Sequence, residues 1–411
     1  MTLCLFEDDG VAHLAPLTLT RAVFDLRVGA RTLAESARAA FPASAFAVRT
    51  RSSVAAVTAQ EHPHALADPP PGGVLFVNGR WRVRVGDVAR AVKAAVSARE
   101  ARAFVQGDAL LALWHPDPPA ALLQDGPARG AGADVPVERV EGEVVVHRLW
   151  DLVDDLPARV AHDVEAAGGL GDVEGRVQEG ARFVEPGRIH VAAGAVVRAG
   201  AVVSGEDGPV WIGAGATVEE NAVVRGPVYV GPKAVVKAAA RVDGSAIGYW
   251  SKVGGEVHES VVHSLSSKGH DGYLGNSYLG RWCNLGADTN TSNLKNDYGE
   301  VTMYDAPEGG AVPTGRQFLG LVMGDHSKCS INTMFNTGTV VGVSCNLFGS
   351  GFPPRHVPSF AWGGSEGLVP YRSEKALRVA EAVMARRDRP LTDADRALLE
   401  AVAAEHGLDA P

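Results

Sequence analysis

The sequence predicts an α/β amino-terminal domain joined to a parallel β-helix, with carboxy-terminal helices at the end of the chain. A chain of 411 residues exceeds the size at which a single core usually stops growing. Strand-like and helix-like segments alternate in the first part, whereas apolar residues recur every six positions in the second. We therefore expect an α/β domain over residues 1–147, a helical linker over 148–187, the β-helix over 188–364 and terminal helices over 365–411.

Charge and composition restrict the class of partner. The net charge is −9 and no basic block is long enough to follow a phosphate backbone, so we expect no nucleic acid and a small-molecule substrate instead. The first ten residues, MTLCLFEDDG, carry acids where a signal peptide has a basic start. No segment approaches the roughly 20 apolar residues of a membrane span. The sequence thus predicts a cytoplasmic protein without a membrane partner.

The cysteines are expected to be small buried side chains. They lie in apolar or repeat contexts and form no Cys-x-x-Cys pair: Cys4, Cys283, Cys329 and Cys345. This arrangement argues against a zinc site and against a disulfide framework.

The six-residue period is the strongest signal in the chain. Apolar residues occupy one position of the period, and small or apolar residues follow four places later: Ile212, Val218, Val224, Val230, Val236 and Val242, then Ala216, Ala222, Val228, Ala234, Ala240 and Ala246. A period of six matches neither an amphipathic helix nor an alternating strand. It fits a coil whose flat sides each turn one large side chain inward, so that stacked coils bury a continuous column.

The same period returns later in the chain, after two interruptions. Its inward residues there are Leu279, Leu285, Met323, Cys329, Phe335, Val341 and Leu347. The interruptions cover residues 256–273 and residues 289–318, and the second contains the polar run TNTSNLKNDYGE. Because loops carried on a rigid scaffold concentrate binding groups, we expect the site at these interruptions.

The first half of the chain reads as alternating strands and helices. We expect strands over residues 3–6, 45–49 and 74–77 and a helix over residues 22–40. This order predicts a mostly parallel sheet, whose ligand site lies at the carboxyl ends of the strands.

Helices are also expected between and after the two domains. Residues 149–164 keep near-helical apolar spacing, with Pro157 close to a helix start. An amphipathic helix is expected over residues 373–387, and Thr392 to Asp395 has the capping pattern of a further helix. These helices should cover the end of the β-helix or a neighbouring subunit, with the basic last turn of the first one as a solvated face.

Two motifs in the second half resemble a known family. The run SKGHDGYLG at residues 267–275, followed by NLGA at residues 284–287, resembles the acetyltransferase half of the bifunctional glucosamine-1-phosphate acetyltransferase/N-acetylglucosamine-1-phosphate uridyltransferases, the GlmU-like family. The resemblance covers about 175 residues. It implies a left-handed β-helix that forms a homotrimer, with acetyl-CoA as co-substrate between neighbouring subunits.

The resemblance also implies roles for single residues. It makes His270 the general base and Asn284 an active-site asparagine, with Tyr273 and Asn293 at the sugar site. Leu294 stands where the family has a further tyrosine, Asp288 replaces a glycine, and the expected upstream basic residues are missing. Three other basic residues are candidates to replace them in binding substrate: Lys295, Arg241 and Lys252.

These residue types suit acyl transfer to an amine. The amine must lose a proton, and imidazole changes charge near neutral pH, so His270 fits that task. Asn284, or the glycine-rich turn around it, would donate hydrogen bonds to the developing oxyanion. Asn284 as a coil-corner residue and Tyr273 as a packing residue are the alternatives. We expect His326 to be an exposed coil residue, and we assign no role to the two remaining histidines of this region, His258 and His263.

The beginning of the chain carries part of a second signature. The run LAPLTLTR at residues 14–21 resembles the second half of the sugar nucleotidyltransferase signature, which implies a Rossmann-like nucleotidyltransferase domain. The glycine-rich, phosphate-cradling first half is replaced by FEDDGVAH at residues 6–13, and Asn78-Gly79-Arg80 stands where the family has a magnesium-binding aspartate. The candidate residues of this site are Arg21, Asp8, Asp9, Asn78 and Arg80.

Three functions are compatible with these patterns. The leading hypothesis is an acetyl-CoA-dependent N-acyltransferase acting on an amino-sugar phosphate or a nucleotide-linked amino sugar, with nucleotidyl transfer and Mg²⁺ added if the amino-terminal domain is active. The alternative is a sugar-1-phosphate nucleotidyltransferase whose β-helix serves mainly for oligomerisation. The third is a sugar-nucleotide-binding scaffold without catalytic activity, in which the amino-terminal domain binds a sugar phosphate or supports assembly.

Overall fold

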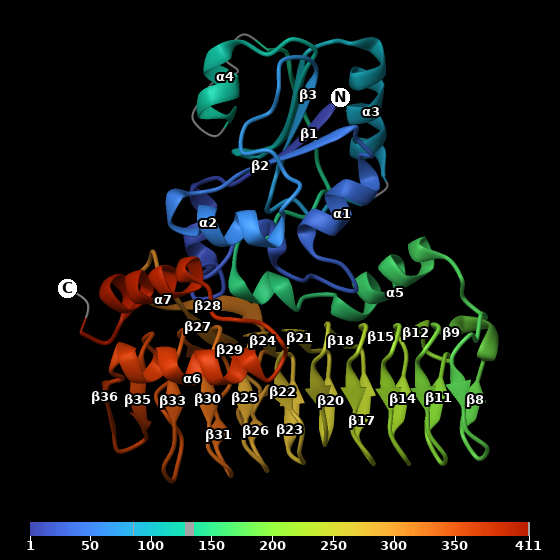
Figure 1. Cartoon of the computed structure of the whole chain (residues 1–411), viewed down its shortest axis with the longest axis vertical. Coiled ribbons are helices and arrows are strands. Elements are labelled where there is room, and N and C mark those ends of the chain that lie inside the picture. Colours follow the sequence, from blue (N-terminus) through green and yellow to red (C-terminus); the bar gives the residue numbers. More distant parts are fainter. Residues whose placement is uncertain (85, 128–134, 410–411) are drawn as a thin grey trace. The chain divides into compact units, whose positions relative to one another are not determined.

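A computed structural model describes residues 1–84, 86–127 and 135–409 (Figure 1). The chain divides into two compact units. Unit 1 consists of Met1–Leu14, Thr20–Leu26 and Arg31–Arg148, and unit 2 consists of Ala15–Leu19, Arg27–Ala30 and Leu149–Pro411. The short segments Ala15–Leu19 and Arg27–Ala30 thus pack with the second unit, although they lie early in the sequence.

Unit 1 is built on a mixed sheet of six strands in the order β2-β1-β3-β5-β4-β6. The strands are β1 (Thr2–Phe6), β2 (Ala45–Arg49), β3 (Val74–Asn78), β4 (Arg102–Gln106), β5 (Ala109–His115) and β6 (Val137–Arg139). The three strands expected from the sequence are present, and β1 pairs in parallel with both β2 and β3. On its other side β3 pairs with the antiparallel β5, a strand that was not expected.

The helices of unit 1 are α1 (Leu33–Ala40), α2 (Ser52–Glu61), α3 (Asp87–Ala98) and α4 (Ala120–Asp125). The expected helix over residues 22–40 is wrong in its first half. Only a short 3-10 turn, Val23–Asp25, precedes α1, which begins at a capping box between Thr32 and Glu35. Segment Arg27–Ala30 belongs to unit 2 and does not extend the helix. The backbone N–H of Arg27 donates to the Tyr278 hydroxyl at 3.0 Å and so makes no helical hydrogen bond.

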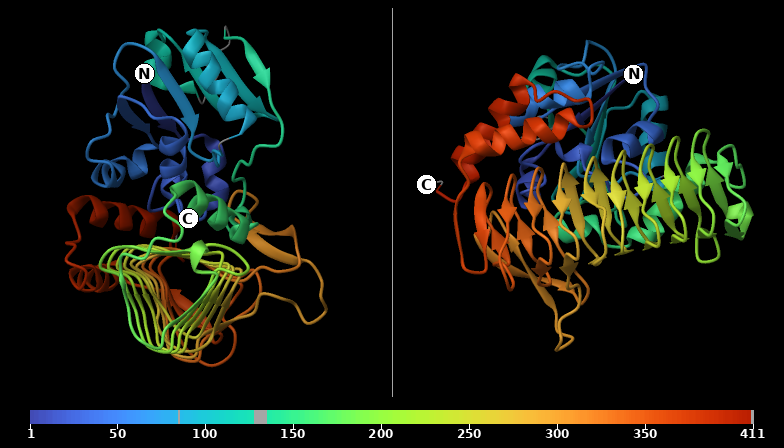
Figure 2. Two further views of the ribbon diagram at one scale, coloured as in Figure 1. Left: turned by 90° about the vertical axis from the view of Figure 1, so that its right-hand side faces the viewer. Right: turned by 60° about the horizontal axis from the view of Figure 1, so that its bottom comes forward.

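Unit 2 is a β-helix with three parallel faces, visible end-on in Figure 2. Face E holds β7 (Arg176–Val177), β10 (Val196–Val197), β13 (Thr217–Val218), β16 (Val235–Val236), β19 (Lys252–Val253), β22 (Ser267–Lys268), β25 (Asn284–Leu285), β30 (Lys328–Cys329), β33 (Asn346–Leu347) and β35 (Ala361–Gly364), and β36 (Gly367–Pro370) adds antiparallel at the end. Face F holds β8 (Arg182–Val184), β11 (Val202–Ser204), β14 (Val223–Arg225), β17 (Arg241–Asp243), β20 (Glu256–His258) and β23 (Tyr273–Gly275), and a short pair, β26 (Asn290–Thr291) and β31 (Met334–Phe335), lies further along the chain. Face D holds β9 (Ile189–Val191), β12 (Val210–Ile212), β15 (Val228–Val230), β18 (Ala246–Ile247), β21 (Val261–Ser264), β24 (Tyr278–Arg281), β29 (Val322–Met323), β32 (Val340–Val341) and β34 (His356–Val357).

The inward residues of the six-residue period form one buried column, as predicted. Each of them has an exposed fraction of 5% or less: Ile212, Val218, Val224, Val230, Val236, Val242, Leu279, Leu285, Met323, Cys329, Phe335, Val341 and Leu347. The four cysteines are free thiols and buried, which agrees with the expectation. Both parts of the predicted fold class are therefore confirmed.

The expected interruption at residues 256–273 is wrong, because β20, β21 and β22 continue all three faces through it. The coils are shorter here: Ala246 pairs with Val261, fifteen positions on, whereas Tyr229 pairs with Ala246, seventeen positions on. Serine hydroxyls bridge the shortened corners. Ser245 accepts from the Ser260 backbone N–H, and Ser260 accepts from that of Ser277, both at 3.0 Å. Hydrogen-bonded stacking thus persists where the six-residue count fails.

The second interruption is real. Residues between β26 and β29 leave the coil and form an antiparallel hairpin of β27 (Val301–Asp305) and β28 (Gly310–Arg316). Arg316, at the end of the hairpin, makes a bidentate contact with Asp154, with its Nε 2.8 Å from each carboxylate oxygen. This contact ties the hairpin to the segment that precedes α5 (Leu156–Ala167).

Helices precede and follow the β-helix in the sequence. Pro157 lies in the first turn of α5, as expected, and β7 and β8 already pair with β10 and β11, so the first coil begins inside the expected linker. After the β-helix follow α6 (Ser373–Ala385) and α7 (Asp393–His406), the latter with the expected capping box. Within the described ranges, none of the helices has the length and apolarity needed to cross a bilayer.

Candidate active site

His270 lies in the turn that connects β22 on face E to β23 on face F. Its side chain is exposed, so the imidazole does not point into the packed interior. The turn marks the edge that the two faces share. A substrate at this edge would be within reach of outward side chains from both faces.

A buried lysine holds the turn of His270 from inside. Lys268 occupies an inward position of the column, between Val253 and Leu285 of the adjacent coils, and is 2% exposed. Its ammonium donates to the His270 carbonyl at 2.6 Å and to the Gly254 carbonyl at 3.0 Å. Burial lowers the pKa of Lys268 from 10.5 to about 8. The signal in the sequence for this role is a lysine directly before the Gly-His pair, at an inward register position.

Tyr273 lies flat on face F, over Gly275. A Cβ at Gly275 would meet the Tyr273 hydroxyl at 2.3 Å, so only glycine allows this position of the ring. The hydroxyl accepts from Asn293 Nδ2 at 3.0 Å, and the same amide donates to Asn276 at 2.7 Å. Burial raises the pKa of Tyr273, so the phenol remains a neutral donor and acceptor. The structure therefore brings two predicted site residues, Tyr273 and Asn293, into contact.

The polar network on face F extends to a histidine to which no role was assigned. Asn276 donates to Glu259 at 2.9 Å, and Glu259 lies 3.8 Å from His258 Nε2. His258 Nδ1 is in contact with the Asp243 carboxylate. The hydrogen bond to Asp243 raises the pKa of His258, with smaller contributions from nearby carboxylates. These residues lie fifteen to seventeen positions apart in the sequence and come together through stacking of neighbouring coils.

The remaining candidates of this half divide between the two faces. Asn284 and Lys252 belong to one outward ladder on face E, where Ser267 pairs with both of them. Arg241 stands on face F, next to Glu256, with which it forms an ion pair. Lys295 contacts its own loop, where it donates to the Glu300 carbonyl at 3.2 Å.

The expectation that His326 is an exposed coil residue is wrong. The side chain is 9% exposed and stacks on Trp282, with ring centroids 6.0 Å apart. The left-handed backbone of this residue, with φ of 61°, places it at a coil corner, where the neighbouring indole covers it. A six-residue register predicts which residues point inward but does not predict which outward residues cover one another.

Three of the amino-terminal candidates form one cluster in unit 1. Arg80 Nε and Nη2 donate to the two oxygens of Asp8 at 2.6 and 2.7 Å. The Asn78 amide donates to Asp8 at 2.7 Å, and the Gly10 backbone N–H donates to it at 3.2 Å. Burial, the largest single effect, raises the pKa of Asp8, but the hydrogen bonds and charge of Arg80, together with the hydrogen bonds from Asn78 and Gly10, outweigh it, so the pKa is lowered. Asp8, Asn78 and Arg80 thus stabilise one another.

This cluster does not fit a magnesium site in the arrangement shown. The Asp8 carboxylate already accepts four hydrogen bonds, which is its usual capacity, so no lone pair is left for a metal. The exposed Asp9 would be a single ligand. The described part of the chain holds no group of three or more histidine, cysteine, aspartate or glutamate residues suited to a metal ion. Arg21 is 3% exposed, and its carbonyl accepts from Arg51 at 2.9 Å.

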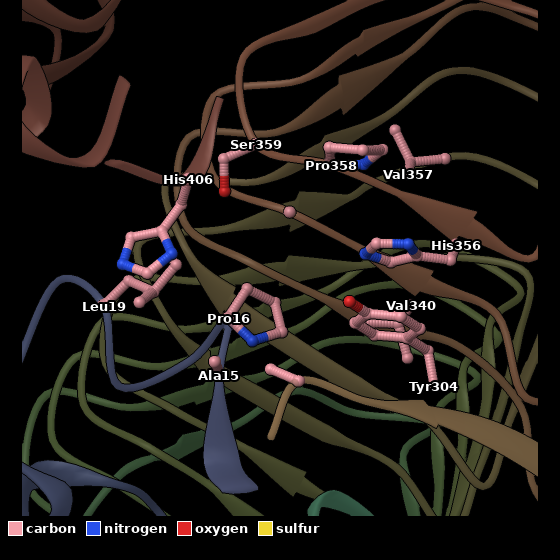
Figure 3. A pocket seen from close by; sticks show the side chains of 12 residues that line it. Ala15, Pro16, Leu19, Tyr304, Val340, His356, Val357, Pro358, Ser359 and His406 are labelled. Carbon is pink, nitrogen blue, oxygen red and sulfur yellow. The ribbon is translucent and has the colours of Figure 1, made fainter. Parts of the chain in front are cut away.

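A small hollow of about 200 Å³ in unit 2 lies outside these clusters (Figure 3). Tyr304 of the hairpin and His356 of β34 stack there, with ring centroids 3.4 Å apart and planes 7° apart. Pro16 and His406 line the opposite side. Burial lowers the pKa of His356 to about 4, so this imidazole is neutral at physiological pH.

Comparison with known proteins supports the resemblance to sugar nucleotidyltransferases and to bifunctional GlmU proteins. Residues 3–168 match the family model described as sugar nucleotidyl transferase. The bifunctional protein GlmU of Methanocaldococcus jannaschii is 33% identical over 104 residues, 25% of each chain. A bifunctional sugar-1-phosphate nucleotidylyltransferase/acetyltransferase of Sulfurisphaera tokodaii is 32% identical over 93 residues, 23% of each chain. The alignments thus span about a quarter of the curated relatives.

Solved structures to which the chain is weakly similar include acyltransferases. The Arabidopsis UDP-N-acetylglucosamine acyltransferase has 12% identity and a TM-score of 0.27, covering 52% of this chain and 78% of its own. The corresponding enzyme of Campylobacter jejuni has 9% identity and a TM-score of 0.21, covering 58% and 96%. These scores are too low to carry a functional argument. In sequence, the chain is similar to sugar nucleotidyl transferases over residues 3–168 and to bifunctional GlmU proteins over about a quarter of its length.

Proposed function

We propose that this protein is an acetyl-CoA-dependent N-acyltransferase that acts on an amino-sugar phosphate or a nucleotide-linked amino sugar. One observation carries the proposal: the exposed His270 lies at the edge between faces E and F, on a turn whose carbonyl is held by the buried Lys268. The Tyr273–Asn293 pair on face F and Asn284 on face E lie on the two sides of this edge. The resemblance to bifunctional GlmU proteins supports the same function.

The residues divide the chemistry of acyl transfer among them. His270 accepts a proton from the substrate amine as its nitrogen bonds to the thioester carbonyl carbon. Asn284 donates a hydrogen bond to the oxyanion that forms. The oxyanion then re-forms the carbonyl as the C–S bond breaks, and the proton held by His270 passes to the leaving sulfur, which releases the thiol. Tyr273 and Asn293 position the sugar, and the rigid coils keep these groups at fixed separations.

The test is release of free thiol from acetyl-CoA, measured with a panel of amino-sugar phosphates and nucleotide-linked amino sugars. His270→Ala should reduce thiol release by about 10²–10⁴-fold, the usual contribution of general-base catalysis, and leave the circular dichroism spectrum unchanged. His64→Ala removes another exposed histidine and serves as the control. Full activity of the His270 variant, or no thiol release with any acceptor, would refute the proposal.

The match of residues 3–168 to sugar nucleotidyl transferases favours a second candidate function for the amino-terminal domain. In this alternative the domain transfers a nucleotidyl group to a sugar 1-phosphate, and the β-helix serves mainly to hold the oligomer. Pyrophosphate release from a nucleoside triphosphate and a sugar phosphate tests it, and a change of Arg21 should abolish that release. Release of neither thiol nor pyrophosphate across a panel of sugar phosphates would favour the third hypothesis, a sugar-nucleotide-binding scaffold.

The assembly proposed with this function is a homotrimer with the thioester donor between neighbouring subunits. The edge at His270 has outward groups on two faces, and a third wall from a neighbouring chain would complete a cleft. Sedimentation equilibrium decides between monomer and trimer. A monomer with full activity would contradict the proposed assembly.

A further inference from the structure

A cavity of about 330 Å³ lies on face E beneath the end of α6. Its lining includes Lys252 and Lys328 from two coils and Arg386 and Arg387 from the end of the helix. Ser267 and Asn284 of the ladder add a hydroxyl and an amide. No carboxylate is among the lining residues.

Apolar contacts fix the end of α6 above this cavity. Met384 packs with Leu265 and Trp282 in one buried cluster. The Arg387 guanidinium lies over the Trp250 ring, 5.4 Å from its centroid. Arg387 is therefore held against the β-helix by packing. Arg386 is exposed, in agreement with the solvated face expected at this basic turn, and reaches the cavity from its solvent side.

Among the described residues, no acid forms an ion pair with any of the four cations Lys252, Lys328, Arg386 and Arg387. The ion pairs within residues 1–84, 86–127 and 135–409 involve other side chains. Within the same ranges, the buried Nε of Arg387 has no hydrogen-bond partner. Lys328 donates only to the His326 carbonyl, at 2.7 Å, and Glu219, the acid that acts on Lys252, is already paired with Lys237 at 2.8 Å.

The pKa values of both lysines in the cavity, Lys252 and Lys328, are lowered. Burial lowers the pKa of Lys328 to about 8. Burial, followed by the charges of Arg387, Lys237 and Arg386, lowers the pKa of Lys252. Like charges held together without a counterion raise the free energy of the folded state, and a bound anion would remove this cost.

We propose that this cavity binds a phosphoryl group of a substrate. Two guanidinium forks and two ammonium groups provide charge and donors for phosphate oxygens, and Ser267 and Asn284 complete the set. Ser267 belongs to the coil that carries His270, so a phosphoryl group here is anchored next to the proposed reaction edge. Its part in acyl transfer rests on the proposed function, whereas anion binding itself does not.

Calorimetric titration of the full chain with inorganic pyrophosphate at constant ionic strength tests the cavity directly. Arg386→Ser and Arg387→Ser should each weaken binding by about tenfold or more, the loss expected for one charge-assisted contact. Arg378→Ser, an equal charge change at an exposed position of the same helix, should leave binding unchanged. Lack of binding by the unchanged protein, or an equal loss in the Arg378 variant, would overturn the proposal.

A second measurement guards against unfolded variants. In phosphate-free buffer the Arg386 and Arg387 variants should melt at or above the temperature of the unchanged protein, because like-charge repulsion is reduced. Pyrophosphate should then raise the melting temperature of the unchanged protein and of Arg378→Ser only. Stabilisation of all variants alike would show general salt effects and refute a specific site.

Kinetics identify which substrate supplies the phosphoryl group. If the group belongs to the sugar, the Arg386 and Arg387 variants should raise the KM for the amino-sugar phosphate by about tenfold and leave that for acetyl-CoA unchanged. If it belongs to the donor, the KM for acetyl-CoA should rise instead. Pyrophosphate binding without any thiol release would refute the acyltransferase function and retain the cavity as an anion site.

Discussion

Replacing Lys268 with methionine separates the charge of this buried side chain from its volume. Methionine fits the inward position between Val253 and Leu285, but it carries no ammonium to hold the His270 carbonyl. We expect the variant to fold with altered pH dependence of stability and with reduced thiol release.

The magnitude follows from the lowered pKa of Lys268. Burial lowers it from 10.5 to about 8, and each pH unit is worth about 1.4 kcal/mol, so the charged ammonium costs the folded state about 3 kcal/mol. This cost is fully present below pH 8. Between pH 8 and 10.5 the folded state releases the proton while the unfolded state keeps it, so the cost disappears as pH rises through this window.

The methionine variant removes this cost but leaves the Gly254 and His270 carbonyls without their donor, at about 1 kcal/mol each. It should therefore be more stable than the unchanged protein by about 1 kcal/mol at pH 7. At pH 10.5 it should be less stable by about 2 kcal/mol, because the neutral amine of the unchanged protein still donates. The difference in unfolding free energy between the two proteins thus reverses its sign.

Urea denaturation followed by circular dichroism at pH 7, 8, 9 and 10.5 measures this difference. Lys233→Met, at an exposed lysine of the same β-helix, controls for the loss of one lysine. A difference between the Lys268 variant and the unchanged protein that stays constant over this range would refute the reasoning. If Lys268 positions His270, kcat should fall by about tenfold or more with little change in KM.

Three further predictions concern other parts of the chain. Gly275→Ala should displace the Tyr273 ring, because its Cβ would lie 2.3 Å from the hydroxyl, and it should raise the KM for the acceptor sugar while KM for acetyl-CoA stays constant. The unchanged protein should lose about 2–3 kcal/mol of stability as pH falls from 6.5 to about 4, because in this range the unfolded state binds a proton at His356 and the folded state does not. His356→Phe should keep the stack on Tyr304 and abolish this loss, which thermal melts across the same pH range measure. Asp8→Asn should destabilise unit 1 by about 3 kcal/mol at pH 7, since the buried arginine beside it loses its counterion, and the loss should shrink as pH falls through the lowered pKa of Asp8.

The β-helix could be predicted because its signal is side-chain burial. Each inward residue from Ile212 to Val242 repeats at six positions, and each is 1% exposed or less. The six-residue spacing does not hold at residues 256–273, although the coil continues there. The coils are shorter in this region, and the hydroxyls of Ser245 and Ser260 accept backbone hydrogen bonds at their corners. A periodicity of apolar residues reports the packed column, whereas the continuity of the coil depends on backbone pairing, which the sequence does not display.

The candidate site was predictable one residue at a time but not as a set. The motif at residues 267–275 indicated His270 and Tyr273, and the Tyr273–Asn293 contact joins two candidates that lie twenty positions apart. The Asp243–His258 pair was missed because its two residues belong to successive coils, and only stacking makes them neighbours. Residues in one outward ladder are separated by fifteen to seventeen positions here, so a search at that spacing would have found them.

In unit 1 three candidate residues lie together, but the relation among them differs from the one expected. Asp8, Asn78 and Arg80 were expected to face a ligand, but they satisfy one another through short hydrogen bonds. Reading a carboxylate as a metal ligand assumes that its lone pairs are free. That assumption does not hold for Asp8, because Arg80, two residues after the end of β3, occupies the carboxylate and supplies the positive charge that a metal would otherwise bring.

Lys268 shows how one unfavourable residue can mark the functional part of a regular fold. Neighbouring inward positions hold apolar side chains, and a charged group among them costs the folded state about 3 kcal/mol at neutral pH. A hydrophobic residue of similar size would avoid that cost, so stability alone does not account for the lysine. What the ammonium adds is a donor to the His270 carbonyl, which accepts no backbone hydrogen bond in the turns and loops that the structure describes. If Lys268→Met proved fully active, the lysine would be a tolerated defect in the column, and the His270 turn would be held by the backbone alone.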